Sequence, residues 1–210
     1  MLDYLKDPDE IYRLSFETVR REAKLARFDA GEAEVAVRLI HACGMPEIAD
    51  DLRFASGAVK AACSALADGA PVICDCEMVA AAIIRGRLPA KNPVLCHLND
   101  PDVRDRARGE STTRSAAQVS NWLDHLEGSV VAIGNAPTAL FRLLEEIAAG
   151  APRPAAILGF PVGFVGAAES KGALVANQPE LPYATLLGRR GGSPIAAAAV
   201  NAISGLEASK

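Results

Sequence analysis

The stretch Ser129–Ala149, SVVAIGNAPTALFRLLEEIAA, decides the fold of this 210-residue chain. Its first part is continuously apolar up to Gly134, which is typical of a strand that is buried on both faces of a sheet. Its second part, Thr138–Ala149, is a helical stretch that follows the glycine-containing turn. The stretch therefore predicts a strand over Ser129–Gly134 and then a helix that packs back onto the sheet.

The same strand-then-helix unit recurs from Leu52 to the end of the chain. Such alternation predicts right-handed crossovers and a mostly parallel sheet with helices on both faces. No linker or internal repeat interrupts it, so we expect a single domain over residues 1–210. The predicted strands are Leu52–Ala55, Pro71–Asp75, Pro93–Leu98, Ser129–Gly134, Ala155–Phe160 and Tyr183–Leu187. The predicted helices are Gly57–Ala67, Glu77–Arg85, Ser111–Leu126, Thr138–Ala149, Gly166–Ala176 and Pro194–Ser204.

Two further helices are expected before the first strand. The first begins near Pro8 and runs to about Arg27. The second begins at Asp29, which has capping-box spacing to Glu32. The apolar residues available for the buried side of the first helix are Ile11, Leu14, Phe16, Val19 and Leu25.

The second of these helices carries Arg38 and His41 three residues apart, so both side chains point to the same face. Gly44 supplies the left-handed residue that commonly ends a helix, which leaves His41 in the last turn. The negative end of the helix dipole favours a protonated imidazole there. An ionisable histidine beside an anion-binding arginine suits proton transfer to a substrate that carries carboxylates. The alternative is a pair that is merely packed or solvated, which is the commoner arrangement on helices.

Glycine-rich or polar loops follow four of the predicted strands. In a parallel sheet the carboxyl ends of the strands meet at one edge, and α/β proteins bind ligands there. Glycines let a ligand approach the backbone closely, and amides at helix starts bind anions. We therefore expect a ligand site at this edge, although most such loops are only structural. The four loops are Asp75–Met78, Gly134–Thr138, Gly159–Gly166 and Gly188–Ser193.

Arginines gather at the same predicted edge. The loop GRRGGS contains Arg189 and Arg190, and it matches neither a P-loop nor the glycine order of a dinucleotide-binding fold. Together with Arg114, these guanidinium groups suit carboxylates, which they bind in bidentate fashion. The alternative is that the arginines pair with local carboxylates such as Glu169 or Glu77.

The composition excludes several classes of protein. The net charge is −4, from 26 acidic and 22 basic residues, and without a basic stripe we expect no nucleic-acid partner. No apolar run is long enough to span a membrane, and the first residues do not have the organisation of a secretory signal. The five cysteines are odd in number and lie mostly in apolar surroundings, which predicts reduced thiols and a cytoplasmic location. We expect no metal site, because alternate residues such as Cys74 and Cys76 point to opposite faces of a strand.

With these segments assembled, the chain resembles the precorrin-8X methylmutase (cobalt-precorrin-8 methylmutase) family of corrin biosynthesis. The resemblance covers essentially the whole chain, from Tyr12 to Ala202, and rests on several motifs in the same order. They are Arg38–Met45, Val72–Ala80 (VICDCEMVA), Thr113–Ala117 (TRSAA), Gly134–Leu144 (GNAPTALFRLL), Gly159–Lys171 (GFPVGFVGAAESK) and Gly188–Ser193 (GRRGGS).

The resemblance implies a flavodoxin-like three-layer α/β/α fold and a homodimer that holds its substrate near the subunit interface. It implies an isomerase that moves a methyl group from C-11 to C-12 of the tetrapyrrole precorrin-8X, giving the corrin hydrogenobyrinic acid without an external cofactor. His41 matches the histidine proposed to protonate the substrate. Ser15 and Arg38 match substrate-contacting positions, and Arg114 matches the arginine of the family's Thr-Arg-Ser motif.

Two other classes of protein remain as alternatives. A tetrapyrrole carrier would keep the arginines and the glycine loops but would have no use for a titrating His41. A nucleotide-dependent oxidoreductase is disfavoured by the missing nucleotide fingerprint. The sequence also leaves open whether the substrate is metal-free or already holds cobalt.

Overall fold

The computed structural model describes residues 2, 4–177 and 181–206 and is organised around a six-stranded sheet. The strands lie in the order β1-β6-β5-β4-β2-β3, and all neighbours pair in parallel except β1, which runs antiparallel to β6. The predicted mostly parallel sheet is confirmed. Its strands are β1 (Leu52–Phe54), β2 (Val72–Cys74), β3 (Val94–Leu95), β4 (Val130–Ile133), β5 (Ala156–Gly159) and β6 (Tyr183–Leu186).

The five parallel strands have a doubly wound topology. When β1 is set aside, the remaining order is that of flavodoxin-like folds, and the strand order reverses between β2 and β4. β1 is an added antiparallel strand at the edge beside β6, with Leu52 opposite Leu186. The carboxyl ends of β2 to β6 therefore meet the amino end of β1 at one edge of the sheet.

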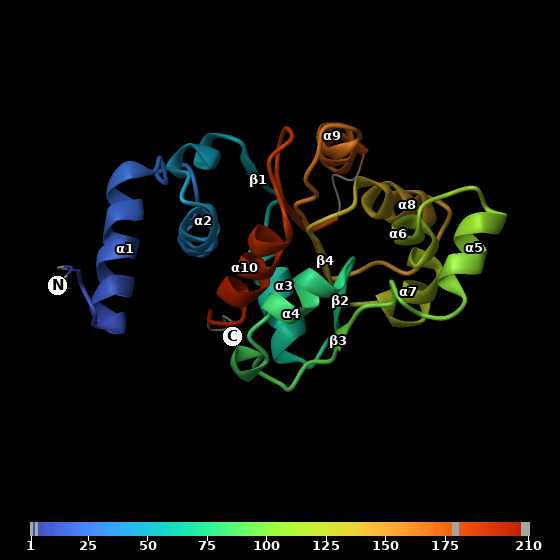
Figure 1. The fold of residues 1–210 in the computed structure, drawn as a ribbon, viewed down its shortest axis with the longest axis horizontal. Helices are drawn as coiled ribbons and strands as arrows, with labels where there is room; N and C mark the ends of the chain where they lie inside the picture. The colour runs from blue at the N-terminus through green and yellow to red at the C-terminus, as the bar shows by residue number, and fades with distance from the viewer. Residues whose placement is uncertain (1, 3, 178–180, 207–210) are drawn as a thin grey trace.

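Helices cover both faces of the sheet, as predicted (Figure 1). Successive residues of β4 point to opposite sides, so Val130 and Ala132 pack in one core and Val131 and Ile133 in the other. The first core also receives side chains of α2 (Ala30–Cys43), α3 (Ala58–Ala67), α4 (Glu77–Ala82) and α10 (Ser193–Ile203). The second receives those of α7 (Val119–Leu126), α8 (Pro137–Ala148) and α9 (Ala167–Asn177).

Helix α1 (Pro8–Glu22) lies on the outside of α2, away from the sheet (Figure 1). Val19 is its only fully buried residue, whereas Ile11 is 44% and Leu14 41% exposed. The prediction that Ile11 and Leu14 belong to the buried side was wrong, because a helix in this outer position contacts one neighbour only along a narrow stripe. The helix also ends before Arg27, since Ala23 takes an extended conformation and begins the turn into α2.

The predicted helix Ser111–Leu126 is shorter and is divided, because Gln118 separates α6 (Arg114–Ala117) from α7. Ser111 has a φ of 51°, which breaks the helical path, so α6 begins only after Thr113, whose hydroxyl accepts from the Ala116 amide. Helix α5 (Val103–Gly109) precedes this break and was not predicted. Short 3-10 helices occur as η1 (Pro46–Asp50) and η2 (Arg85–Arg87). Within the described residues, no helix combines the length and the apolarity needed to span a bilayer.

Candidate active site

His41 lies in the last turn of α2, where the sequence predicts it. Asp29 caps the first turn by accepting a hydrogen bond from the Glu32 amide at 2.8 Å, and the Glu32 carboxylate accepts one from the Asp29 amide. Gly44 has a φ of 69°, and its amide donates to the Ile40 carbonyl. Both ends of α2 are therefore set by local chemistry, and the His41 ring is left exposed at the surface.

Three side chains of α1 contact the His41 ring and leave the rest of it exposed. Ser15 Oγ lies 2.8 Å from Nδ1 of His41. The Tyr12 ring stacks on the imidazole with 5.7 Å between centroids, and the Phe16 ring meets it edge-on at 5.1 Å. One turn of α1 therefore fixes the plane of the imidazole, and because Ser15 engages Nδ1, Nε2 is the ring nitrogen left to meet a ligand.

A pocket of about 350 Å³ opens beside this ring, between α1 and the end of α2. Its lining is mixed: Ser15, Thr18, Glu22 and His41 are polar, and the other five residues are apolar or glycine. Such a mixture suits a ligand with an apolar surface that is oriented by several polar contacts. The lining residues are Leu14, Ser15, Thr18, Val19, Glu22, Ile40, His41, Gly44 and Pro46.

Arg38 lies one turn before His41 and shares a neighbour with it. Its guanidinium is 4.6 Å from the centroid of the Phe16 ring, which also contacts His41. Burial and the nearby Arg87 lower the pKa of Arg38, and Arg38 forms no ion pair with any carboxylate of the described residues. A half-buried cation without a counter-ion stabilises a bound anion, so Arg38 is suited to a carboxylate of a ligand.

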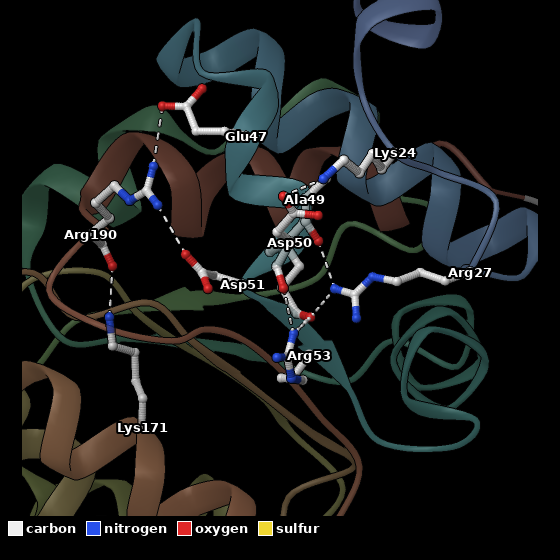
Figure 2. A network of polar contacts seen from close by, with 10 residues as sticks. Lys24, Arg27, Glu47, Ala49, Asp50, Asp51, Arg53, Lys171 and Arg190 are labelled. Atoms are coloured by element: carbon white, nitrogen blue, oxygen red, sulfur yellow. Dashed lines mark hydrogen bonds and ion pairs between the residues drawn. The ribbon is translucent and has the colours of Figure 1, made fainter.

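Arg190 is occupied within the chain. Its guanidinium donates to Asp51 at 2.9 Å and to Glu47 at 3.3 Å, both at the ends of η1 (Figure 2). Pairing with local carboxylates was one of the two alternatives drawn from the sequence, but the carboxylates are not Glu169 or Glu77. The substrate contact predicted for Arg190 therefore stays a prediction, and it would compete with this ion pair.

The other two predicted arginines lie farther from His41. The Arg189 guanidinium is 5.5 Å from the centroid of the Phe164 ring, in the exposed loop after β5. Arg114 begins α6 and, with Arg104 and Arg108, lines a polar pocket of about 440 Å³. Because α6 and α2 cover opposite faces of the sheet, one chain does not bring Arg114 beside the His41 pocket (Figure 1).

The loop after β4 does not offer its amides to a ligand. The buried carboxylate of Asp75 accepts hydrogen bonds from the amides of Gly134, Asn135 and Ala136, at 2.8 to 2.9 Å. Burial raises the pKa of Asp75, and the three amide hydrogen bonds act against that rise. A ligand at this edge of the sheet would therefore not bind these three amides, because a carboxylate of the chain already occupies them at the point where the strand order reverses.

Some of these residues could not be assigned from the sequence. Tyr12 is three residues before Ser15, so the helical period alone places both on one face of α1, and this signal was available. Asp75 and the buried Lys171 carry no local signal, since the groups that hydrogen-bond to them come from other loops.

Within residues 2, 4–177 and 181–206, no group of three or more histidine, cysteine or acidic side chains is placed to hold a metal ion.

Comparison with known proteins gives a consistent set of relatives. A family model described as precorrin-8X methylmutase matches residues 10–206. Precorrin-8X methylmutase of Pseudomonas aeruginosa is 58% identical over 203 residues, which are 97% of this chain and 98% of that protein. Cobalt-precorrin-8 methylmutase of Methanothermobacter thermautotrophicus is 38% identical, over 96% of this chain and 94% of that protein. The crystal structure of precorrin-8x methyl mutase from Thermus thermophilus matches with a TM-score of 0.83 at 38% identity, covering 92% of this chain and 95% of that one.

Proposed function

Because the chain belongs to the precorrin-8X methylmutase family, we propose that it moves a methyl group from C-11 to C-12 of precorrin-8X, with His41 as the proton donor. Membership of this family makes the chain an intramolecular methyl transferase, an isomerase of cobalamin biosynthesis. One observation carries the residue assignment. The exposed His41 ring borders the pocket between α1 and α2, and its Nδ1 lies 2.8 Å from Ser15 Oγ.

The proposed reaction begins with transfer of the Nε2 proton of His41 to the conjugated ring system. In the imidazolium, Nδ1–H donates to Ser15, so the ring keeps its orientation while the Nε2 proton leaves. Protonation changes the electron distribution of the macrocycle, and the bond from the methyl group to C-11 breaks as the bond to C-12 forms. The rearranged ring system then returns a proton to Nε2, so substrate and product, hydrogenobyrinic acid, have the same composition.

The chain's own residues supply what this rearrangement needs. General acid catalysis of this kind contributes roughly 10²–10⁴ in rate. Arg38 is placed to bind a carboxylate of the substrate beside the protonating ring. The apolar wall formed by Leu14, Val19 and Ile40 suits the face of the macrocycle and limits access of water.

We propose that a second copy of the chain completes the substrate site beside His41. The exposed face of α1 carries large apolar side chains, which protein interfaces cover more often than solvent does. Arg114 lies on the opposite face of the sheet from His41, so a second copy is the simplest source of further contacts to a ligand at His41. Analytical ultracentrifugation is expected to give twice the 21.9 kDa chain mass. A monomer at micromolar concentration would contradict the homodimer. The exposed apolar residues are Ile11, Tyr12 and Leu14 of α1, together with Tyr4 and Leu5 before the helix.

Absorbance spectroscopy tests the function directly. The 58% identical relative is named for precorrin-8X and the 38% identical one for cobalt-precorrin-8, so we propose the metal-free tetrapyrrole as substrate. Purified protein is mixed with each of the two forms, and the spectrum is followed over time. Conversion of metal-free precorrin-8X to a product of unchanged mass is expected, with slower conversion of the cobalt form. A bound spectrum that never progresses to product would indicate the tetrapyrrole carrier instead.

A further inference from the structure

Lys171 is an unusual residue for the interior of a protein. It belongs to the first turns of α9 and is fully buried, yet its ammonium group meets no carboxylate of the described residues. Nζ donates instead to two backbone carbonyls, that of Pro161 at 3.0 Å and that of Arg190 at 2.6 Å. Burial lowers the pKa of Lys171 to about 8. Because an unpaired buried cation is costly, the Lys171 ammonium depends on these two carbonyls for its stabilisation.

The two carbonyls belong to different loops at the carboxyl edge of the sheet. Pro161 follows β5 and Arg190 follows β6, and further hydrogen bonds join the same loops. The Gly192 amide donates to the Phe160 carbonyl at 2.8 Å, and the Gly163 amide donates to the Arg189 carbonyl at 3.2 Å. A side chain at position 191 would bring its Cβ into the Phe160 carbonyl oxygen, so the two loops are in close contact there. Hydrogen bonds therefore tie the two loops into one unit, with the Lys171 ammonium between them.

From this unit the Arg190 side chain reaches the other face of the sheet. Figure 2 shows Lys171 bonded to the Arg190 carbonyl, while the guanidinium of the same residue points to Glu47 and Asp51. These two carboxylates stand at the two ends of η1. Lys171 and Arg190 thus connect α9 on one face with η1 on the other, across the edge of the sheet.

The segment that Arg190 holds forms a wall of the His41 pocket. Pro46, the first residue of η1, lines that pocket together with Gly44. From the opposite side, Lys24 pairs with Asp50 at 3.0 Å, and Arg27 donates to the Ala49 carbonyl at 2.6 Å (Figure 2). η1 is therefore held by cations on both sides, and the Arg190 ion pair links it to the sheet edge beside the hydrogen bond from the Leu187 amide to the Asp51 carbonyl.

We infer that Lys171 and Arg190 are positioning residues, which hold η1 and so keep the wall of the pocket in register with the His41 ring. The inference rests on the proposed function, because its effect is measured on the methyl shift. It gives Arg190 a different role from the direct contact with a substrate carboxylate that the sequence predicts. The two roles predict opposite results for the neutralisation of Asp51.

A double-mutant cycle on kcat separates the two roles. Arg190→Gln and Asp51→Asn are each expected to lower kcat, on the order of 10- to 100-fold for misplacement of a reacting group by about 1 Å. Their effects should not add, so the double variant is expected to be no slower than the slower single variant. Binding of hydrogenobyrinic acid should change little in all three variants. Arg142→Gln is the matched control, because it removes an ion pair of similar exposure on α8, and it should leave kcat unchanged.

Direct contact of Arg190 with the substrate predicts the reverse. Asp51→Asn would then release a guanidinium held by a competing carboxylate, and it would tighten binding of hydrogenobyrinic acid. Additive losses in the cycle, tighter product binding by Asp51→Asn, or an unchanged kcat in Arg190→Gln would each overturn the inference. Failure of the wild-type protein to convert precorrin-8X would overturn the proposed function instead.

Hydrogen exchange provides a readout that does not depend on activity. The Ile48 and Asp51 amides, which bond within η1, are expected to exchange faster in Arg190→Gln and in Lys171→Met, while the amides of α8 keep their wild-type rates. Unchanged exchange at η1 in Arg190→Gln would show that the ion pair does not hold this segment. If Lys171→Met does not fold, the Arg190→Gln result alone decides.

Discussion

Replacing His41 by alanine is expected to lower the rate of methyl migration by at least about a hundredfold, the lower end of what a positioned general acid contributes. Folding should be unaffected, because the ring is exposed and its contacts are to α1 at the surface. Binding of hydrogenobyrinic acid should also be retained, since the carboxylate contact assigned to Arg38 remains. Single-turnover absorbance measurements with precorrin-8X, together with a product titration, check both points.

Two further variants make the result specific. His125→Ala removes another exposed histidine, on α7, and should leave turnover unchanged. Arg38→Ala should show the opposite division from His41→Ala, with weaker product binding and a smaller loss of turnover. Near-normal turnover by His41→Ala would remove His41 as the proton donor. A collapse of turnover in Arg38→Ala at unchanged product affinity would instead assign Arg38 to orienting the His41 ring.

Replacing Asp75 by asparagine is expected to be the most destabilising single change at the sheet edge. In its better orientation the asparagine oxygen accepts from Asn135 and Ala136, but its NH₂ group then faces the Gly134 amide, so two buried donors have no acceptor. Each buried donor left without an acceptor costs about 1–3 kcal/mol, so a loss of roughly 2–6 kcal/mol is expected from the free energy of unfolding. The free energy of unfolding of a native domain is about 5–15 kcal/mol, so this single change is expected to remove a large part of the stability of the chain.

Urea denaturation followed by circular dichroism measures the effect. Asp124→Asn provides the matched control, because the Asp124 side chain is exposed on α7, and it should leave the urea midpoint within error of wild type. A loss below about 0.5 kcal/mol in Asp75→Asn, the range of ordinary surface substitutions, would show that the loop after β4 does not depend on this carboxylate.

Local patterns in the sequence were sufficient for much of the fold. The apolar run before Gly134 and the helix after it are found as β4 and α8, and both boundaries of α2 follow from Asp29 and Gly44. The late start of the helix predicted over residues 111–126 was missed, because a serine gives no local signal of the left-handed φ that Ser111 adopts. The antiparallel direction of β1 was also outside what alternation of strands and helices can predict.

The candidate site also has a part that the sequence could predict and a part that it could not. The pairing of Arg38 with His41 in the last turns of α2 could be predicted from a spacing of three residues. The hydrogen bond between Ser15 and His41 joins residues 26 apart, and no pattern in either segment indicates it. The assignment of these positions before the structure came from the family resemblance, and the geometry now supplies a physical role for Ser15, which is to hold Nδ1.

The sequence by itself determined the type of most elements, their order along the chain, and the face of α2 that carries the imidazole and the guanidinium. The tertiary structure alone decided that the carboxylate of Asp75 fills the amides after β4 and that Arg190 binds Glu47, 143 residues away. The physical reason is the distance along the sequence between the residues that interact. Capping and helical period depend on atoms within about four residues, whereas an ion pair between distant loops exists only after the chain has closed the sheet between them.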